Sequence, residues 1–323
     1  MRFRKHAVGV GLFLGCAIIV TTAVTLKGVP YPAREKQWSI GIYTGQSPFH
    51  LHPGPHAVNP VVSARDLTDV PATFVADPFM IKRDATWYMF FEVMNADTGQ
   101  GDIGFATSSD GWQWRYGGVV LDEPFHLSYP YVFESGGVQY MIPESLQAQA
   151  IRLYKADEFP TRWTFVRPLL AGHDFSDPSL VHYGDKWWLF VATNRYTNGT
   201  LSLYYADALE GPWNEHPLSP VVRDDPHIAR PGGRIFTLGD RLFRYAQDDA
   251  PTYGTQVWAF EITQLTTTSY REERVGDSPI TAGTGTGWNA SGMHHVDPHQ
   301  LGENEWLACV DGYRKAWVLR HWP

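Results

Sequence analysis

The sequence has few cysteines, little clustered positive charge and none of the common cofactor-binding motifs. It has two cysteines in 323 residues, and Cys16 lies in an apolar N-terminal stretch, so an internal disulfide with Cys309 is not expected. The net charge is −8 and no basic run follows the first five residues, which argues against nucleic acid as a partner. A phosphate-binding loop, a Cys/His zinc spacing, a nucleophile elbow and an amphipathic helix are all absent from the sequence. The domain must therefore be held together by packing and sheet hydrogen bonds, and the sequence predicts no cofactor.

The long apolar run of the sequence lies at its N-terminus. Arg2, Arg4 and Lys5 precede 20 uncharged residues, 7–26, which is enough to span a bilayer. Positive charge before the run predicts an inside N-terminus and an exported, membrane-anchored domain. A cleaved signal peptide, which would make the protein secreted, and a lipoprotein site at Cys16 are the alternatives, and both also place the domain outside the cytoplasm. We expect 1–26 to be a membrane anchor or signal segment and 27–37 to be a linker.

One pattern occurs five times along the rest of the chain. An Xaa-Pro pair opens a short apolar strand, and after a turn a second strand rich in aromatic residues follows. Successive prolines of these pairs lie 48 to 67 residues apart. A period near 50, with two strands in its first twenty residues, is typical of the blade of a β-propeller. The five pairs are Asp77-Pro78, Tyr129-Pro130, Asp177-Pro178, Arg230-Pro231 and Asp297-Pro298.

The repeats also supply outer strands, because each blade should hold four antiparallel strands. A third apolar strand is predicted in each repeat, at 103–109, 151–156, 201–206, 257–262 and 317–322. Blade five stops after its third strand, while an early strand at 38–45 has no partner. We expect 38–45 to supply the missing outer strand of blade five and so to close the ring. The prediction is an all-β, five-bladed β-propeller over 38–323, preceded by one N-terminal transmembrane helix.

The repeat predicts that polar side chains of all five blades lie around the propeller axis. The first residue of each inner strand of a propeller sits at the mouth of the central funnel, so the residues before the five prolines should surround one axis. Asp before Pro also starts strands for purely geometric reasons. The change to Tyr129 and Arg230 at equivalent places favours a function, since geometry alone would choose Asp in every blade.

A second ring of polar residues follows the second strand of blades one to four: Glu92, Glu144, Asn194 and Asp248. The second strand runs antiparallel to the first, so its end returns to the same mouth. The alternative for each is an exposed loop residue. Glu144 is the best placed acid, because Pro143 makes its approach rigid.

Crowded carboxylates have pKa values that are pushed apart, and glycoside hydrolysis needs one protonated and one ionised carboxyl group. We take Asp77, Glu144 and Asp177 as the candidate catalytic residues. Arg230 could bind a sugar hydroxyl, a carboxylate or a phosphate. The full set of candidate substrate-binding residues is Glu92, Gln100, His126, Tyr129, Asn194, Arg230, Asp248 and His295.

Blade five contains three histidines and an aspartate within six residues, which invites a metal interpretation. His295, Asp297 and His299 alternate along the chain and could share one face of a strand. Without a Cys/His spacing, we favour instead a histidine on the propeller axis that binds substrate or a water-bound cation. No metal ligands are assigned, and a structural cation near the axis stays open.

These residues resemble those of the five-bladed furanosidase-type glycoside hydrolases, such as arabinanases, β-xylosidases, invertases and levansucrases. Those families begin the first inner strand with one Asp and the inner strand two blades later with another, and Asp77 and Asp177 match both positions. Their acid is a Glu that usually begins a later inner strand. Arg230 stands there in this chain, so Glu144 is the candidate acid.

A closer resemblance, over roughly 40–275, is to the N-terminal domain of plant glucosamine inositolphosphorylceramide transferases and their bacterial relatives. It is carried by the strings at 99–104, 126–133, 143–145 and 252–254. In the plant proteins this domain precedes a separate glycosyltransferase domain, so we do not expect the transferase activity of this propeller.

The sequence thus predicts an exported, glycoside hydrolase-like propeller that acts on a cell-envelope or furanosidic glycan by a carboxylate acid/base mechanism. A non-catalytic carbohydrate-binding propeller that assists glycan or glycolipid assembly is the alternative, because such a module could carry the same residues. A transglycosylase is the third reading. Intact carboxylates at positions 77, 144 and 177 favour an enzyme, since a binding module would tolerate amides there.

Overall fold

The structure is a computed structural model that describes residues 30–194 and 196–321. The chain divides into two compact units, of which Gln37–Arg314 is the propeller. The described residues 30–36 and 315–321 belong to the other unit and are the ends of two strands. In the described part of the chain, no helix has the length and apolarity that a membrane crossing needs. The predicted span at 7–26 lies outside the described residues.

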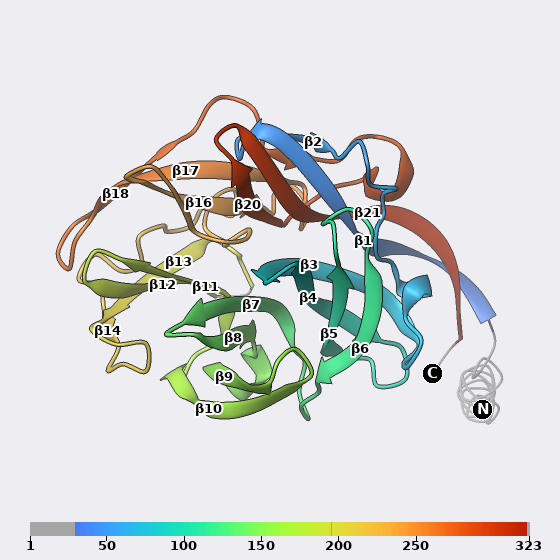
Figure 1. Ribbon diagram of the computed structural model, residues 1–323, viewed down its shortest axis with the longest axis horizontal. Coiled ribbons are helices and arrows are strands. Elements are labelled where there is room, and N and C mark those ends of the chain that lie inside the picture. Colours follow the sequence, from blue (N-terminus) through green and yellow to red (C-terminus); the bar gives the residue numbers. More distant parts are fainter. Residues whose placement is uncertain (1–29, 195, 322–323) are drawn as a thin grey trace, which may run out of the picture. The chain divides into compact units, whose positions relative to one another are not determined.

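The propeller consists of five antiparallel sheets, each with at least four strands, which Figure 1 shows following one another around a common centre. From inner to outer strand, blade one is β3 (Ala72–Arg83), β4 (Thr86–Asn95), β5 (Gly101–Ser108) and β6 (Arg115–Leu121). Blade two is β7 (Ser128–Ser135), β8 (Val138–Glu144), β9 (Ala150–Glu158) and β10 (Arg162–Ala171). Blade three is β11 (Phe175–Tyr183), β12 (Lys186–Thr193), β13 (Thr200–Ala206) and β14 (Asn214–Glu215).

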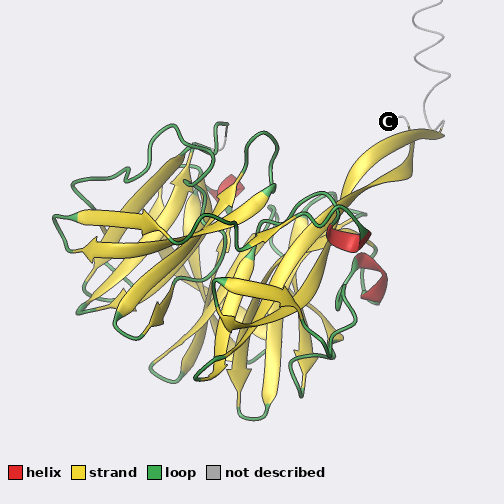
Figure 2. Cartoon of the chain, turned by 90° about the horizontal axis from the view of Figure 1, so that it is seen from above, coloured by secondary structure: helices red, strands yellow, loops and turns green. Residues whose placement is uncertain are grey.

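Blades four and five follow the same plan with modifications. Blade four is β15 (Phe236–Leu238), β16 (Arg241–Asp248), β17 (Gln256–Leu265) and β18 (Tyr270–Arg274), and β19 (Thr281–Ala282) also pairs with β17. Blade five is β20 (Val296–Gly302), β21 (Glu305–His321), β1 (Pro30–Ser47) and β2 (His50–Pro53). The helical structure among the described residues consists of the short 3-10 turns η1 (Ala64–Asp66), η2 (Leu146–Ala148) and η3 (Gly287–Asn289), drawn in red in Figure 2.

The core lies between the blades, which explains why the strands are apolar on both faces. In β4, for example, five consecutive residues from Met89 to Val93 are buried. One apolar cluster joins blades five and one, and others join blades four and five and blades three and four. The largest cluster joins blade two to its neighbours on both sides. A strand that is covered on both faces reads as a continuous apolar run rather than an alternation.

The N-terminal strand closes the last blade, as predicted, but from a different position. β1 lies third in the sheet, next to β21, and β2 is the outer strand. The prediction of 317–322 as a separate third strand of blade five was wrong, because residues up to His321 continue β21 without a turn. β1 also begins at Pro30, inside the predicted linker at 27–37.

Gly312 lies within β21, where it has a packing role. Asp-Gly is a turn signal in the sequence, yet both residues remain within β21. A Cβ on Gly312 would lie 2.5 Å from the Cβ of Asn289 in η3. The glycine therefore serves the close approach of η3 to β21 rather than a turn.

Candidate active site

Three of the five Xaa-Pro pairs share one unusual backbone conformation. Asp77, Tyr129 and Asp177 have φ values of 55°, 46° and 51°, in the left-handed region that residues with a side chain rarely adopt. At each of them the pairing between the first and second strands of the blade skips, which marks a β-bulge. Bulges turn a side chain and an N–H group out of the regular ladder. Here the Xaa residue of the pair is turned out in blades one, two and three.

The N–H groups of these three residues are met by carboxylates. The Asp77 N–H donates to Asp311 Oδ2 at 2.9 Å, and the Asp177 N–H donates to Glu144 Oε2 at 3.0 Å. The Tyr129 N–H donates to Asp77 Oδ2 at 3.3 Å. These hydrogen bonds bring acids of several blades close together. The charges of Asp77, Glu144, Asp177 and Asp311 all raise the pKa of Glu92. We refer to Asp77, Glu92, Glu144, Asp177 and Asp311 as the acid cluster.

Arg230 brings a guanidinium group to this cluster. Its guanidinium donates to Asp177 Oδ2 and lies 3.6 Å from Glu144 Oε2. The Gln247 Nε2 group also donates to Asp177 Oδ2, at 2.7 Å. The Asp177 side chain is only 2% exposed, whereas those of Asp77 and Glu144 are 7% and 9% exposed. Asp77 and Glu144 are therefore the better placed of the three predicted catalytic residues to touch a substrate.

Burial raises the pKa values of the cluster, to different extents. It raises the pKa of Glu144 to about 8, with a further increase from the neighbouring Asp177. It raises the pKa of Asp77 to about 7, where the His294 ring opposes the rise and Asp177 and Asp311 add to it. The pKa of Glu92 is raised well above its usual range by burial and then by Asp77 and Glu144. At neutral pH, Glu144 therefore holds a proton while Asp77 titrates.

His126 joins the cluster through Glu92. Glu92 Oε1 lies 3.3 Å from His126 Nε2. The N–H of Gly101 donates to His126 Nδ1 at 2.8 Å, so the proton of the neutral ring sits on Nε2, facing Glu92. Burial lowers the pKa of His126, which keeps the ring neutral. The Gln100 side chain instead donates to the Glu123 carbonyl at 2.8 Å, and the structure does not bring it to the acids.

Two residues of the predicted second ring, Asn194 and Asp248, do not occupy the position equivalent to Glu92 and Glu144. Glu92 pairs with Ala76 and Glu144 with Ser128, so the equivalent of both in blade three is Ala192, which pairs with Ser176. Asn194 comes two residues later, in an exposed turn with φ 67°. Asn194 therefore does not share the position of the two glutamates, and its role in binding substrate stays a prediction.

Asp248 lies one residue beyond the position in blade four that corresponds to Glu92 and Glu144. A step of one residue along a strand reverses the side-chain direction. The residue that reaches the cluster from blade four is Gln247. Asp248 faces away, where it accepts hydrogen bonds from Gln256 Nε2 (2.8 Å) and Trp258 Nε1 (3.2 Å) and contacts His227. Asp248 is thus buried among groups of its own blade, and not beside the other acids.

Tyr129 and His295 are close to the cluster but fully buried. The Tyr129 hydroxyl lies 2.9 Å from Ser179 Oγ and accepts the Gly233 N–H at 2.7 Å, so it ties blades two, three and four together. His295 packs against Phe79 and Tyr129 with ring centroids 4.5 and 5.3 Å apart. Burial lowers its pKa to about 4, and neither of its ring nitrogens has a hydrogen-bond partner in the described structure. His295 Nδ1 lies 4.0 Å from Asp77 Oδ1.

The fifth Xaa-Pro pair differs from the first three. Asp297 pairs in regular register with Cys309, with no bulge at this pair. Its carboxylate contacts Arg234 (2.5 Å) and accepts the Met80 N–H (2.6 Å). Although burial acts to raise it, Arg234 and His299 hold the pKa of Asp297 well below its usual range. Asp297 is therefore an ionised partner of Arg234 rather than a member of the acid cluster.

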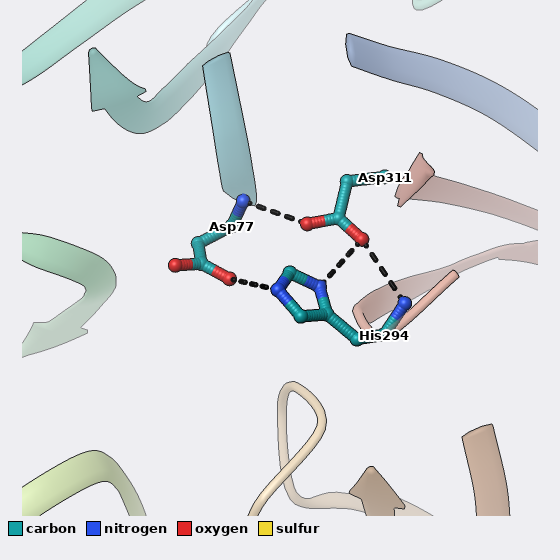
Figure 3. A group of neighbouring side chains, drawn as sticks. All are labelled: Asp77, His294 and Asp311. Atoms are coloured by element: carbon teal, nitrogen blue, oxygen red, sulfur yellow. Dashed lines mark hydrogen bonds and ion pairs between the residues drawn. The ribbon is translucent and has the colours of Figure 1, made fainter. Parts of the chain in front are cut away.

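His294 and Asp311 are cluster residues that the sequence did not single out. As Figure 3 shows, His294 lies between the two aspartates, with Nδ1 2.8 Å from Asp311 Oδ1 and Nε2 3.7 Å from Asp77 Oδ1. Trp38 of β1 stacks on the His294 ring with centroids 4.0 Å apart. Burial lowers the pKa of His294, but Asp311 and Asp77 raise it to a greater extent, so the net shift is upward. The ring thus lies between two carboxylates that favour its protonated form.

The same three residues are the set, among the described residues, whose ligand atoms could converge on a metal ion, with atoms within 4.8 Å of one another. Two of these atoms, His294 Nδ1 and Asp311 Oδ1, are already hydrogen-bonded to each other. A metal ion at this place would have to replace that bond.

Comparison with known proteins assigns the family. Residues 31–313 match the family model described as glucosamine inositolphosphorylceramide transferase 1, N-terminal. The chain belongs to this family. Glucosamine inositolphosphorylceramide transferase 1 of Oryza sativa subsp. japonica is 38% identical over 304 residues, covering 88% of this chain and 41% of the relative. The Arabidopsis thaliana protein of the same name is 36% identical, covering 87% and 39%. The chain therefore spans about two fifths of the length of these curated relatives.

Solved structures share the fold of this family member. An exo-1,5-α-L-arabinanase from a bovine ruminal metagenomic library superposes with a TM-score of 0.56 at 14% identity, covering 76% of this chain and 93% of that one. The catalytic domain of the Coprinopsis cinerea GH62 α-L-arabinofuranosidase gives a TM-score of 0.56 at 13% identity, covering 87% and 98%. At such low identity the likeness shows the five-bladed propeller alone.

Proposed function

We propose that the acid cluster is an active site that acts on a glycosidic bond of a cell-envelope or furanosidic glycan. The observation that carries this proposal is that Asp77 and Glu144 keep exposed fractions of 7% and 9% within a buried group of carboxyl groups, which raises the pKa of Asp77 to about 7 and that of Glu144 to about 8. Cleavage of a glycosidic bond needs one carboxyl group as acid and another as base or nucleophile. A general base works best with a pKa near the working pH.

Each carboxyl group has an oxygen suited to its proposed role. The contacts of Glu144 with the Asp177 N–H and with Arg230 both lie on Oε2, which leaves Oε1 to carry the proton to the leaving oxygen. Asp77 is the base that activates water or the nucleophile that attacks the sugar, and the Tyr129 N–H and His294 hold its carboxylate. Asp177 modulates the acid, since its charge raises the pKa of Glu144.

The test is the substitution Asp77→Asn in the full chain. The amide keeps the shape of the side chain but cannot act as base or nucleophile, so glycan turnover should fall by at least about a thousandfold while glycan binding changes little. Asp240→Asn, in the exposed β15–β16 turn, is a control with the same change of charge. Turnover that survives in Asp77→Asn would end the proposal for hydrolysis.

A second candidate is a non-catalytic glycan-binding propeller, or a transglycosylase that passes a sugar to another sugar instead of water. Both alternatives are favoured by the names of the relatives, which are transferases. This chain spans about two fifths of their length. In a binding module, Asp77→Asn would leave glycan binding unchanged and there would be no turnover to lose. A transglycosylase would release longer glycans when an acceptor sugar is in excess.

We also propose that residues 1–26 anchor the propeller in a membrane with the domain on the exported side. The proposal rests on the positive residues before the apolar run at 7–26. Protease added to cells with a permeabilised outer layer should digest the propeller. Protection of the domain until the inner membrane is lysed would contradict the proposal.

A further inference from the structure

The strand ends that lie outside the propeller unit form a short ribbon. Residues 30–36 of β1 and 315–319 of β21 belong to one compact unit, and β1 and β21 are neighbours in their sheet. Two side-chain contacts show that these strands run antiparallel: Thr44 with the Trp306 carbonyl (2.8 Å) and Arg314 with Gln37 (3.4 Å). Residues 315–319 therefore lie beside the first residues of β1, as the paired strand ends near the C-terminus show in Figure 2. We refer to 30–36 and 315–319 as the terminal ribbon.

One face of the terminal ribbon exposes large apolar side chains. Trp317 and Leu319 are 72% and 73% exposed, and as alternate residues of β21 they point to the same face. Of the tryptophans in the described part of the chain, Trp317 alone is exposed. Tryptophan is enriched where a protein meets the membrane–water interface, because its ring is apolar and its N–H group is polar.

The terminal ribbon also differs from the propeller in charge. It carries three basic residues, Arg34, Lys36 and Lys315, and one acid, Glu35, whereas residues 37–314 contain 18 basic and 33 acidic residues. An anionic lipid surface attracts basic segments and repels acidic ones. It therefore favours the ribbon over the propeller as the contacting part. A second copy of the chain fits the ribbon less well, since pairing two ribbons would bring like charges together.

The position of the ribbon along the chain points to the same surface. The apolar run at 7–26 is followed by three residues and then by Pro30, where β1 begins. From residue 26 to residue 30 an extended chain reaches at most about 14 Å. The headgroup layer on each side of a bilayer is roughly 5–8 Å deep. With 7–26 in the membrane, as proposed above, β1 begins within or next to this layer.

We propose that the terminal ribbon lies on the bilayer surface, with Trp317 and Leu319 inserted among the lipid headgroups and Lys315 at the level of the phosphates. The contact is a second attachment beside the apolar run, and it is independent of the chemistry of the acid cluster. The inference uses the proposed membrane span, so the experiment has to separate the two.

Quenching of a fluorescent label by lipid tests the contact in the full chain. Cys16→Ser leaves the buried Cys309 as the native cysteine, and Leu319→Cys then carries an environment-sensitive label. The chain is reconstituted in vesicles of phosphatidylcholine with about 30% phosphatidylglycerol, with and without lipids that bear a nitroxide just below the headgroups. The nitroxide lipid should remove at least about half of the emission at 319.

The matched control is the same label in Val58→Cys, at a propeller side chain that is 89% exposed. Its emission should fall by less than about a tenth, because the propeller is not the lipid-contacting part. Adding Trp317→Ser to the Leu319→Cys chain should reduce the quenching at 319 by about half, since the main interfacial side chain is then lost.

A label at 319 that remains open to aqueous iodide and unquenched by the nitroxide lipid would overturn the inference. So would a label that is shielded from iodide but unquenched by the lipid, because protein would then cover this face. Quenching that is unchanged by Trp317→Ser would also overturn it. If the chain does not float with the vesicles, the span and the ribbon contact both fail. Flotation with an unquenched label removes only the ribbon contact.

Discussion

Asp77 is held by its backbone as well as by its side chain. The left-handed conformation before Pro78 costs roughly 1–3 kcal/mol, and the N–H that it turns outward is bound by Asp311. Tyr129 and Asp177 repeat the arrangement in the next two blades. Three equivalent strained residues, each with a carboxylate on its N–H, tie the positions of the acids to the repeat itself.

A stability prediction follows from Glu144. Its pKa in the folded protein, about 8, is above the usual value of 4.5, so the folded state binds a proton that the unfolded state releases. The stabilisation is complete below about pH 4.5 and is lost as the pH rises through 8. Glu144→Gln cannot ionise and should escape this loss. Between pH 5 and pH 9 its free energy of unfolding should rise relative to the parent by roughly 4 kcal/mol, which raises its melting temperature by several degrees.

Thermal melting across this pH range checks the prediction, with Glu303→Gln at an exposed turn as the control. A constant difference between Glu144→Gln and the parent at all pH values would mean that Glu144 is ionised in the folded protein.

For individual residues, the sequence could predict the positions of those acids that the repeat places at equivalent points of the blades. Asp77, Glu144 and Asp177 meet because strand direction and repeat length are visible in the sequence. Asn194 and Asp248 were misplaced because the second strands were aligned by their polar ends instead of by their hairpins. Aligning Trp306 with Trp87 would have placed Asp311 beside Glu92. Nothing in the sequence distinguishes the adjacent His294 and His295, and both rings lie within 4.0 Å of Asp77 Oδ1.

β1 is the element on which ring closure depends. It inserts Trp38, Ile40, Ile42 and Tyr43 into the clusters between blade five and its neighbours. Trp38 also covers His294, so the same strand completes the fold and one wall of the acid cluster. The sequence showed that a strand was missing from blade five and that 38–45 was unpaired. It could not show the position of β1 in the sheet, because the Asp311-Gly312 pair resembles a turn.

The closure predicts a strong effect of deleting β1. Removal of 38–45 should leave the propeller unfolded, whereas removal of 1–29 should leave it folded. As a milder change, Ile42→Ala should lower the free energy of unfolding by about 2–5 kcal/mol, because Ile42 is fully buried. Val58→Ala, at a side chain that is 89% exposed, should change it by less than about 0.5 kcal/mol. Denaturant unfolding measures both, and equal stability of the 38–45 deletion and the parent would refute the closure.

In the propeller as a whole, the blades supply the scaffold and the acid cluster supplies the chemistry. Five sheets pack through apolar clusters, as the repeat of aromatic strands predicted. The arabinanase and arabinofuranosidase structures share this five-bladed fold. The cluster departs from that apolar pattern, with acids from blades one, two, three and five buried within reach of one another. Each buried carboxyl group costs free energy, which the hydrogen bonds to the three backbone N–H groups offset only in part. That cost is consistent with selection for function at this place.

The pH dependence of glycosidic bond cleavage by the full chain tests the central claim most directly. If Asp77 is the base and Glu144 the acid, the rate should rise as Asp77 ionises near pH 7 and fall as Glu144 loses its proton near pH 8. In Glu144→Gln, substrates with a good leaving group should still be cleaved and the alkaline limb should disappear. A profile with one limb near pH 4, or an alkaline limb that persists in Glu144→Gln, would contradict the account.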